Sequence, residues 1–433
     1  MVDIDRLHDA NERLIGEHTP DVKRFFSAHY DNVRPAIYTS SDVRDAGFKA
    51  ASVDANAFPA GFNNLCPRSR EGAVKEVRRY FERHHPDIGR VLLLPEDHTR
   101  NPYYIENVRY LSTILDEAGV VHSIGSADPE VVYGVQGITT PSGETVDYSL
   151  VTRRNGELFV GGKKVDLVFS NNDFTTGRPD VLKGADVPVI PDPRLGWAHR
   201  TKAKHFALYN ALATQLAETI GLDPWHLTVP TREIAAVDFK GREGLERVGE
   251  AAAAILQETQ ERYDTLGIDA TPRVFVKDAA GTYGMGILSA TTPEDITSLN
   301  NRGRQKMDKG KYGHKVHRVI VQEGVPTRDK IKEATAEPVV YMIRGRPIGA
   351  FYRYHPERDD GDNLNQPGMK FLPVCQHKGC HEDEKAEKVS VCLPNIEHLA
   401  AELAALALAY EGTEEVMAAA DSSEVKVPAV KVA

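Results

Sequence analysis

Cysteine is scarce in this chain, which has four cysteines among 433 residues. That density is far below the density of a disulfide-stabilised scaffold, so the fold must depend on hydrophobic cores. Long apolar runs are absent too, because no stretch approaches the roughly 20 residues that cross a bilayer. The N-terminal segment MVDIDRLHDANERL is acidic and amphipathic, unlike a secretory signal. These absences predict a cytoplasmic protein that does not interact with membranes.

Positive charge is in short supply as well. The chain has 53 Lys and Arg against 63 Asp and Glu, which gives a formal net charge of −10. Nucleic acids bind to clustered basic residues, so this balance argues against a nucleic-acid partner. If an anion such as ATP binds, local cations must attract it against the field of the whole chain. The length allows two or three packed domains.

The first part of the chain alternates strand and helix patterns. RVLLL at residues 90–94 is a short apolar run, typical of a buried parallel strand. Residues 70–84 place Val74, Val77 and Phe81 on one helical face. The alternation predicts an α/β domain, which we assign to residues 1–198.

The second part has a different pattern. A helix is expected over residues 202–220, and the segment 337–353 reads as a hairpin that turns at Arg344–Gly345. We assign an α+β nucleotide-binding region to residues 199–412. Residues 413–433 lack a core-forming pattern, so we expect a flexible tail there.

The most informative motif is VFVKDAAGTYGMGI, residues 274–287. A β-branched strand ends in Lys277, and Gly281, Gly284 and Gly286 follow in a loop. Phosphates favour a lysine beside backbone N–H groups that only glycine lets approach closely. It is not a Walker A loop, because the lysine precedes the glycines. A glycine hairpin with an incidental lysine is the alternative.

A second motif, KAASVDANAFPAGFNNLCPR, spans residues 49–68. Asp54 and Asn56 are two residues apart on a predicted strand, so their side chains point to one face. A carboxylate and an amide oxygen together suit Mg²⁺, which prefers few protein ligands plus nucleotide phosphates. A turn-capping aspartate and asparagine remain the alternative on these residues alone.

Polar side chains flank this motif and are candidates for binding an amino-acid substrate. An arginine among them could pair with an α-carboxylate in bidentate fashion, although ordinary loop polarity would explain any one of them. The candidates are Ser40, Ser41, Arg44, Asn63, Asn64 and Arg68.

One further cluster, Cys375-x-His377-x-x-Cys380-His381, could bind zinc. So tight a spacing lets about three ligands converge at most, and the surrounding residues are highly charged. A flexible loop is therefore the favoured interpretation.

Taken together, four segments resemble a glutamate–cysteine ligase family of proteobacteria, the type of acidophilic iron oxidisers. They are residues 37–66, 274–287, 318–327 and 363–371, and the likeness spans about residues 35–375. The resemblance implies an α/β and α+β architecture with an ATP-grasp fold like that of glutathione synthetase. It also implies a permuted order, as in eukaryotic-type glutathione synthetases, because the metal strand precedes the nucleotide core. Aspartate replaces glutamate in the E-x-N pair, which puts the metal geometry in doubt.

The resemblance implies ligation of the L-glutamate γ-carboxylate to the L-cysteine amine through an acyl phosphate, with ATP and Mg²⁺. It assigns Lys277 and Arg353 to catalysis, and Asp54 and Asn56 to the metal. Among two lysines that open the 202–220 helix, Lys204 is favoured for ATP. The implied ATP-binding set is Lys202, Lys204, Lys277, Gly281, Tyr283, Gly284, Gly286, Gln322, Glu323, Val325 and Glu337. To the substrate candidates the resemblance adds Asn363 and Asn365.

Two other functions stay open at this point. One is another ATP-grasp carboxylate–amine ligase, such as glutathione synthetase. The other is a non-catalytic nucleotide-binding protein. The expected partners are the small molecules glutamate, cysteine and ATP. The sequence does not fix the oligomeric state, for which a homodimer is one option.

Overall fold

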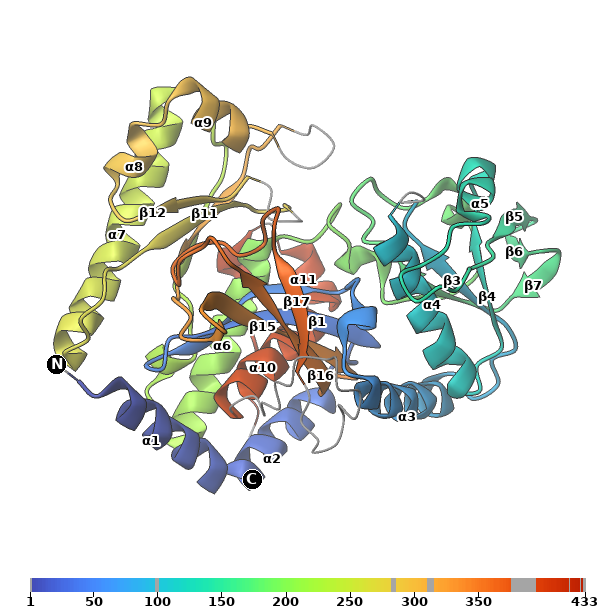
Figure 1. Cartoon of the computed structure of the whole chain (residues 1–433), viewed down its shortest axis with the longest axis horizontal. Coiled ribbons are helices and arrows are strands. Elements are labelled where there is room, and N and C mark those ends of the chain that lie inside the picture. Colours follow the sequence, from blue (N-terminus) through green and yellow to red (C-terminus); the bar gives the residue numbers. More distant parts are fainter. Residues whose placement is uncertain are drawn as a thin grey trace.

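The computed structural model describes residues 2–97, 101–281, 286–309, 315–374, 395–419, 421–428 and 430. It contains three β-sheets with helices between and around them (Figure 1). This mixed architecture confirms the α/β and α+β prediction at that level. Tyr283, Gly284 and the Cys375–His381 cluster lie outside the described residues.

The central sheet combines strands from both ends of the chain. Its order is β17-β16-β15-β1-β2, with β14 paired to β15, and every pairing is antiparallel. The strands are β1 (Tyr38–Asp45), β2 (Ala50–Asn56), β14 (Lys330–Ile331), β15 (Ala334–Ile343), β16 (Arg346–His355) and β17 (Lys370–Val374). The predicted turn joins β15 to β16, and its two residues have the positive φ values of 55° and 69° that tight hairpins need.

One face of the central sheet is covered by helix α10. On one face, Val43, Val340 and Met342 pack against Ala401 and Ala405 of helix α10 (Asn395–Glu411). α10 is rich in alanine and leucine on all sides, as expected of a helix enclosed by protein. Helix α6 (Lys202–Ile220) packs against α10.

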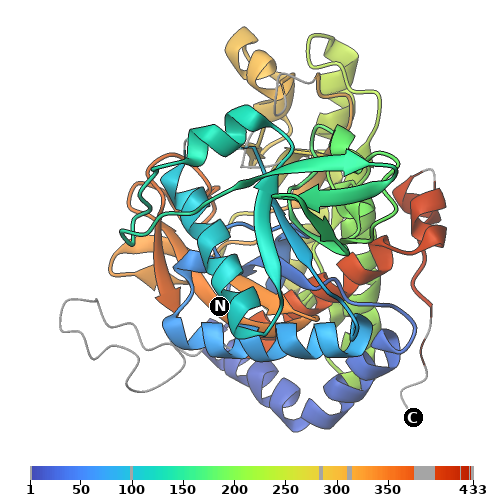
Figure 2. The same ribbon diagram turned by 90° about the vertical axis from the view of Figure 1, so that its right-hand side faces the viewer.

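A seven-stranded sheet lies on one side of the central sheet and faces the viewer in Figure 2. Its order is β7-β6-β5-β4-β3-β8-β9, and the predicted RVLLL strand, β3, lies between two parallel neighbours. The strands are β3 (Val91–Pro95), β4 (His122–Ser126), β5 (Ser149–Arg154), β6 (Glu157–Val160), β7 (Lys163–Val165), β8 (Leu167–Asn171) and β9 (Val189–Ile190). Its helices are α3 (Pro67–His84), α4 (Pro102–Glu117) and α5 (Pro129–Val135).

An antiparallel four-stranded sheet lies on the other side (Figure 1). Its order is β10 (Thr231–Ile234), β13 (Val319–Glu323), β11 (Val274–Asp278) and β12 (Leu288–Ala290). Its helices are α7 (Arg242–Leu266), α8 (Glu294–Thr297) and α9 (Asn301–Met307). The remaining helices are α1 (Ile4–Glu17), α2 (Thr19–Tyr30) and α11 (Glu414–Ala418). Among the described helices, none combines the length and apolarity that a bilayer crossing requires.

The central sheet crosses the predicted boundary at residue 198. The strand that carries Asp54 and Asn56 is β2, which pairs with β1 inside residues 1–198. β1 in turn pairs with β15, which lies in the region 199–412. Hydrophobic periodicity predicts that a strand exists and says nothing about which distant strand completes its hydrogen bonds. The boundary at residue 198 itself stays a prediction.

Two buried carboxyl groups predict how stability should depend on pH. Burial, reinforced by Asp45, raises the pKa of Asp329 to about 6. Burial, reinforced by Asp329, raises the pKa of Glu397 well above its usual value. The folded protein therefore holds protons that the unfolded chain releases, so the free energy of unfolding should fall as pH rises from about 4 to 7.

We expect Glu397→Gln, which cannot ionise, to reduce that fall in the free energy of unfolding. Urea unfolding at several pH values would measure it. Glu415→Gln is the matched control, because Glu415 is an exposed glutamate on helix α11. Equal pH dependence in the wild type and Glu397→Gln would contradict the interpretation.

Candidate active site

The free face of the central sheet gathers the residues that the sequence motifs predicted. Asp54 lies directly opposite Asp42 in the β1–β2 pair, and Asn56 lies opposite Ser40. Directly opposed residues share a face, so all four side chains point to the same side. The Arg353 and Glu337 pair is opposed in the same way between β15 and β16. The antiparallel register therefore brings residues from both halves of the sequence to one face.

Two cavities adjoin on this face. The smaller one has a volume of about 60 Å³ and the larger one about 1300 Å³. Both are lined by Asp42, Asp54, Arg353 and Asn365. Because these residues border both spaces, ligands in the two cavities would meet beside them.

Most of the predicted site residues line one cavity or the other. The smaller cavity is lined by Arg44, Asp54, Lys202, Lys277, Gly281, Glu337, Arg353, Asn363 and Asn365. The larger cavity is lined by Ser40, Asp54, Asn56, Asn63, Asn64, Arg353 and Asn365. Of the predicted site residues, most of the cationic side chains line the smaller cavity. Those that line the larger cavity carry mainly amide and hydroxyl groups.

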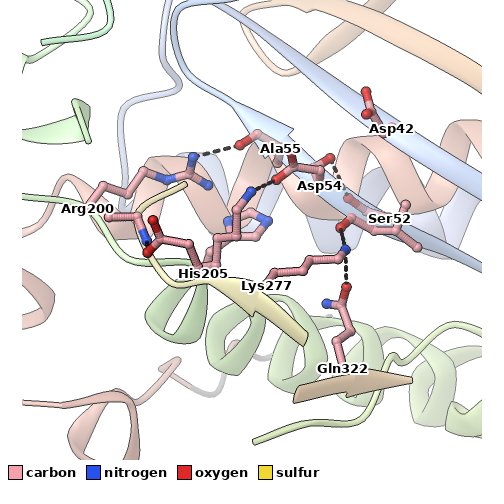
Figure 3. A network of polar contacts seen from close by, with 12 residues as sticks. Asp42, Ser52, Asp54, Ala55, Arg200, His205, Lys277 and Gln322 are labelled. Carbon is pink, nitrogen blue, oxygen red and sulfur yellow. Dashed lines mark hydrogen bonds and ion pairs between the residues drawn. The ribbon is translucent and has the colours of Figure 1, made fainter. Parts of the chain in front are cut away.

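Asp54 lies at the centre of a cluster of cations (Figure 3). Lys202 donates a hydrogen bond to its Oδ1, and Arg200 and Lys277 lie near it. Burial opposes ionisation of Asp54, but the Lys202 and Lys277 ammonium groups outweigh burial and hold its pKa below the usual value. Asp54 is therefore ionised at neutral pH.

Lys277, at the end of β11, is held rigidly. Its Nζ donates to the Val53 carbonyl oxygen at 2.9 Å and to Gln322 Oε1 at 2.7 Å. Burial lowers its pKa to about 8. A lysine so desolvated gains from an anionic ligand, because a nearby negative charge restores the ammonium form.

A chain of alternating charges crosses the face beside Asp54. Arg353 Nη1 donates to Asp42 Oδ2 at 2.7 Å and to Glu337 Oε1 at 2.8 Å, and Arg44 Nε donates to Glu337 Oε2 at 2.6 Å. Burial opposes ionisation of Glu337, but Arg44 and Arg353 hold its pKa below the usual value. Burial raises the pKa of Asp42 despite its arginine partner. Among the described residues, Arg353 Nε has no hydrogen-bond partner. A ligand can use that donor.

The D-x-N pair suits a hard cation. Asp54 offers an ionised carboxylate, and the Asn56 side chain has no hydrogen bond with any other described residue. Both residues line the larger cavity, and Asp54 also lines the smaller one. Mg²⁺ keeps several waters and takes few protein ligands, so one carboxylate and one amide beside a cavity lined by cations fit it.

Some predicted residues lie away from the cavities. Lys204, the favoured phosphate lysine, donates instead to the Val416 and Ala419 carbonyl oxygens, and Lys202 occupies the cavity. Lys202 and Lys204 are two residues apart on one helix, which corresponds to a rotation of about 200° around the helix axis. Their side chains therefore point to opposite sides of the helix. The hydroxyl of Ser41 donates to Ser52 Oγ, away from both cavities.

Three residues of the implied ATP-binding set lie around the end of β13. Gln322 bonds Lys277 through its side chain, and Glu323 forms a buried ion pair with Lys49. The side chain of Val325 is buried in a hydrophobic core. These three residues and Arg68 line neither cavity. The sequence pattern located the strand, and the ATP-binding role of these residues stays a prediction.

Asp42 and Trp197 are among the cavity residues that sequence reasoning missed. Asp42 borders both cavities, and its position two residues after Ser40 was the signal that both share a face. Trp197 lines the larger cavity, and its ring lies 4.6 Å from the Arg200 guanidinium and 4.8 Å from Lys202 Nζ. These are cation–π distances, so the indole helps to hold the two cations.

Buried cations, a carboxylate–amide pair and a large adjoining cavity are typical of an enzyme that activates anionic substrates. The chain belongs to the glutamate–cysteine ligase family, whose family model matches residues 12–412. The predicted function, glutamate–cysteine ligation, is thereby confirmed.

Solved structures were compared as well. A protein from Methylobacillus flagellatus KT, provisionally named a gamma-glutamylcysteine synthetase, is 34% identical with a TM-score of 0.83. The match covers 95% of this chain and 97% of that one. A glutathione synthetase-like effector from Globodera pallida, in apo form, is 10% identical over 79% of each chain with a TM-score of 0.36, too low to carry an argument. The comparison with curated proteins finds no match.

Proposed function

We propose that the chain joins the γ-carboxylate of L-glutamate to the amine of L-cysteine through a γ-glutamyl phosphate made from ATP. The observation that carries this proposal is the adjoining pair of cavities, which share Asp42, Asp54, Arg353 and Asn365. A nucleotide phosphate in the smaller cavity and a carboxylate in the larger one would meet there. Phosphoryl transfer needs that proximity.

The chemistry explains why the site holds charges rather than a nucleophile. A free carboxylate does not react with an amine because oxide is a poor leaving group. Attack of a carboxylate oxygen on the γ-phosphorus releases ADP and leaves an acyl phosphate. The amine nitrogen then attacks the carbonyl carbon, the C–O bond to phosphate breaks, and inorganic phosphate and an ammonium proton depart. The protein must mainly place the substrates and neutralise charge.

Individual residues take distinct parts in this proposal. Lys277 and Lys202 bind the ATP phosphates, and Arg353 stabilises the transferring phosphoryl group and the tetrahedral intermediate. Mg²⁺, held by Asp54 and Asn56, would supply neutralisation of phosphate charge. Ser40, Asn63, Asn64 and Asn365 are placed to bind the amino acids.

The finer classification also belongs to this proposal. We infer an ATP-grasp nucleotide region with a permuted order, because the strand that carries Asp54 precedes the Lys277 motif in sequence and lies beside it in space. The division at residue 198 and the proteobacterial type rest on the sequence segments alone.

Product identification tests the function directly. With ATP, Mg²⁺, glutamate and cysteine, mass spectrometry should detect γ-glutamylcysteine in step with ADP release. Replacing glutamate and cysteine with γ-glutamylcysteine and glycine should give no ADP. The reverse result would assign a glutathione synthetase activity, and no ATP turnover with either pair would overturn the proposal.

The two lysines at the start of α6 provide a matched pair of variants. We expect Lys202→Ala to lower kcat/KM for ATP by about 10²-fold, because it removes a cation from the phosphate cavity. Lys204→Ala should change it less than about threefold, since Lys204 binds backbone carbonyls away from the cavity. Steady-state ADP release measures both. The opposite ranking would return the phosphate role to Lys204.

A further inference from the structure

A buried carboxylate at the end of α10 connects the C-terminal part of the chain to the metal strand. Glu411 accepts hydrogen bonds from Arg200 Nε at 2.7 Å and Arg200 Nη2 at 3.3 Å. It also lies 2.6 Å from His205 Nδ1. The three side chains are only 2%, 4% and 1% exposed, for Arg200, Glu411 and His205. A carboxylate is acceptor-only, so His205 must carry its proton on Nδ1.

Arg200 connects Glu411 to the strand of the D-x-N pair (Figure 3). Its Nη1 donates to the Ala55 carbonyl oxygen at 2.6 Å, and Ala55 is the residue between Asp54 and Asn56. The next contact along the chain comes from the Lys202 backbone N–H, which donates to the Ala279 carbonyl oxygen at 2.7 Å. The start of α6 is therefore fixed against both β2 and the lysine–glycine motif.

We infer that Glu411 is a positioning residue for the metal site. By fixing the Arg200 fork it fixes the Ala55 carbonyl, and so the spacing at which Asp54 and Asn56 present their oxygens. Mg²⁺ demands nearly ideal octahedral geometry, so a small displacement of either ligand weakens binding. This inference rests on the proposed assignment of Asp54 and Asn56 to the metal.

The test measures metal binding without turnover. We expect Glu411→Gln to raise the dissociation constant of Mn²⁺ in the presence of ADP by about 10- to 100-fold. Replacing a residue that orients metal ligands typically weakens metal binding by that factor. Electron paramagnetic resonance of free Mn²⁺ gives this value. The KM for Mg²⁺ should rise similarly while the KM for cysteine stays unchanged. Glu414→Gln is the matched control, because Glu414 pairs with Arg194 and its side chain is 85% exposed.

Two further variants keep the outcome decisive. If circular dichroism shows that Glu411→Gln does not fold, Arg200→Lys replaces it, since lysine keeps the charge and loses the fork. Asp54→Asn tests the underlying assignment. Wild-type Mn²⁺ affinity in Asp54→Asn would reject the metal site itself. Loss of affinity in Asp54→Asn with wild-type affinity in the folded Glu411 or Arg200 variant would reject only the positioning role.

Discussion

Replacing Asp54 by asparagine should lower glutamate- and cysteine-dependent ADP release by about 10³-fold. Asp54 borders both cavities and is the ionised group of the D-x-N pair, surrounded by Lys202, Lys277 and Arg200. Asparagine keeps the shape and removes the charge. The variant therefore loses the carboxylate that we propose as the Mg²⁺ ligand and leaves three cations without their common partner.

The measurement needs a check on folding, because an altered charge cluster can also destabilise the protein. Circular dichroism and thermal unfolding should show a folded chain. Asp180→Asn is a matched control: Asp180 pairs with Lys183, and its side chain is 93% exposed. Near wild-type turnover in folded Asp54→Asn would remove Asp54 from the mechanism.

Replacing Lys277 by methionine should lower kcat/KM for ATP by about 10²- to 10³-fold. Methionine has a similar length and fills the space, so the change removes mainly the ammonium group. That group lies in the smaller cavity and is positioned by Val53 and Gln322. A buried cation in a preorganised position stabilises transferred phosphate far more than a solvated one.

An exposed lysine provides the comparison for this variant. Lys240 lies 3.5 Å from Asp308, and its side chain is 68% exposed. Lys240→Met should leave ADP release within about twofold of the wild type, since surface changes have small effects. Unchanged kcat/KM in Lys277→Met, with the fold intact, would mean that the glycine motif does not bind ATP phosphates.

The contrast between Lys202 and Lys204 shows what a local sequence pattern predicts about a helix and what it does not. The sequence predicted the helix over residues 202–220, and the structure has it with those bounds. It favoured Lys204 over Lys202, the lysine that lines the cavity, because the rotation of a helix relative to another element is set by packing. The same reason explains Gln322, whose strand was expected but whose side chain binds Lys277.

For Asp42, the sequence does contain a local indication of its position. Its alternation with Ser40 placed it on the face of a strand, but nothing local showed that the face borders the site. Only the pairing of β1 with β2 and β15 places Asp42 between Asp54 and Arg353.

The sequence by itself determined the class of elements, the lysine–glycine and D-x-N motifs, and the family, because these depend on residue types at short spacing. The tertiary structure alone decided which strands pair across the chain, which lysine lines the cavity, and that Arg200 joins Glu411 to the Ala55 carbonyl of β2. Those outcomes depend on contacts between residues far apart in sequence. Such contacts are chosen by packing and hydrogen bonding in three dimensions, and no local pattern encodes them.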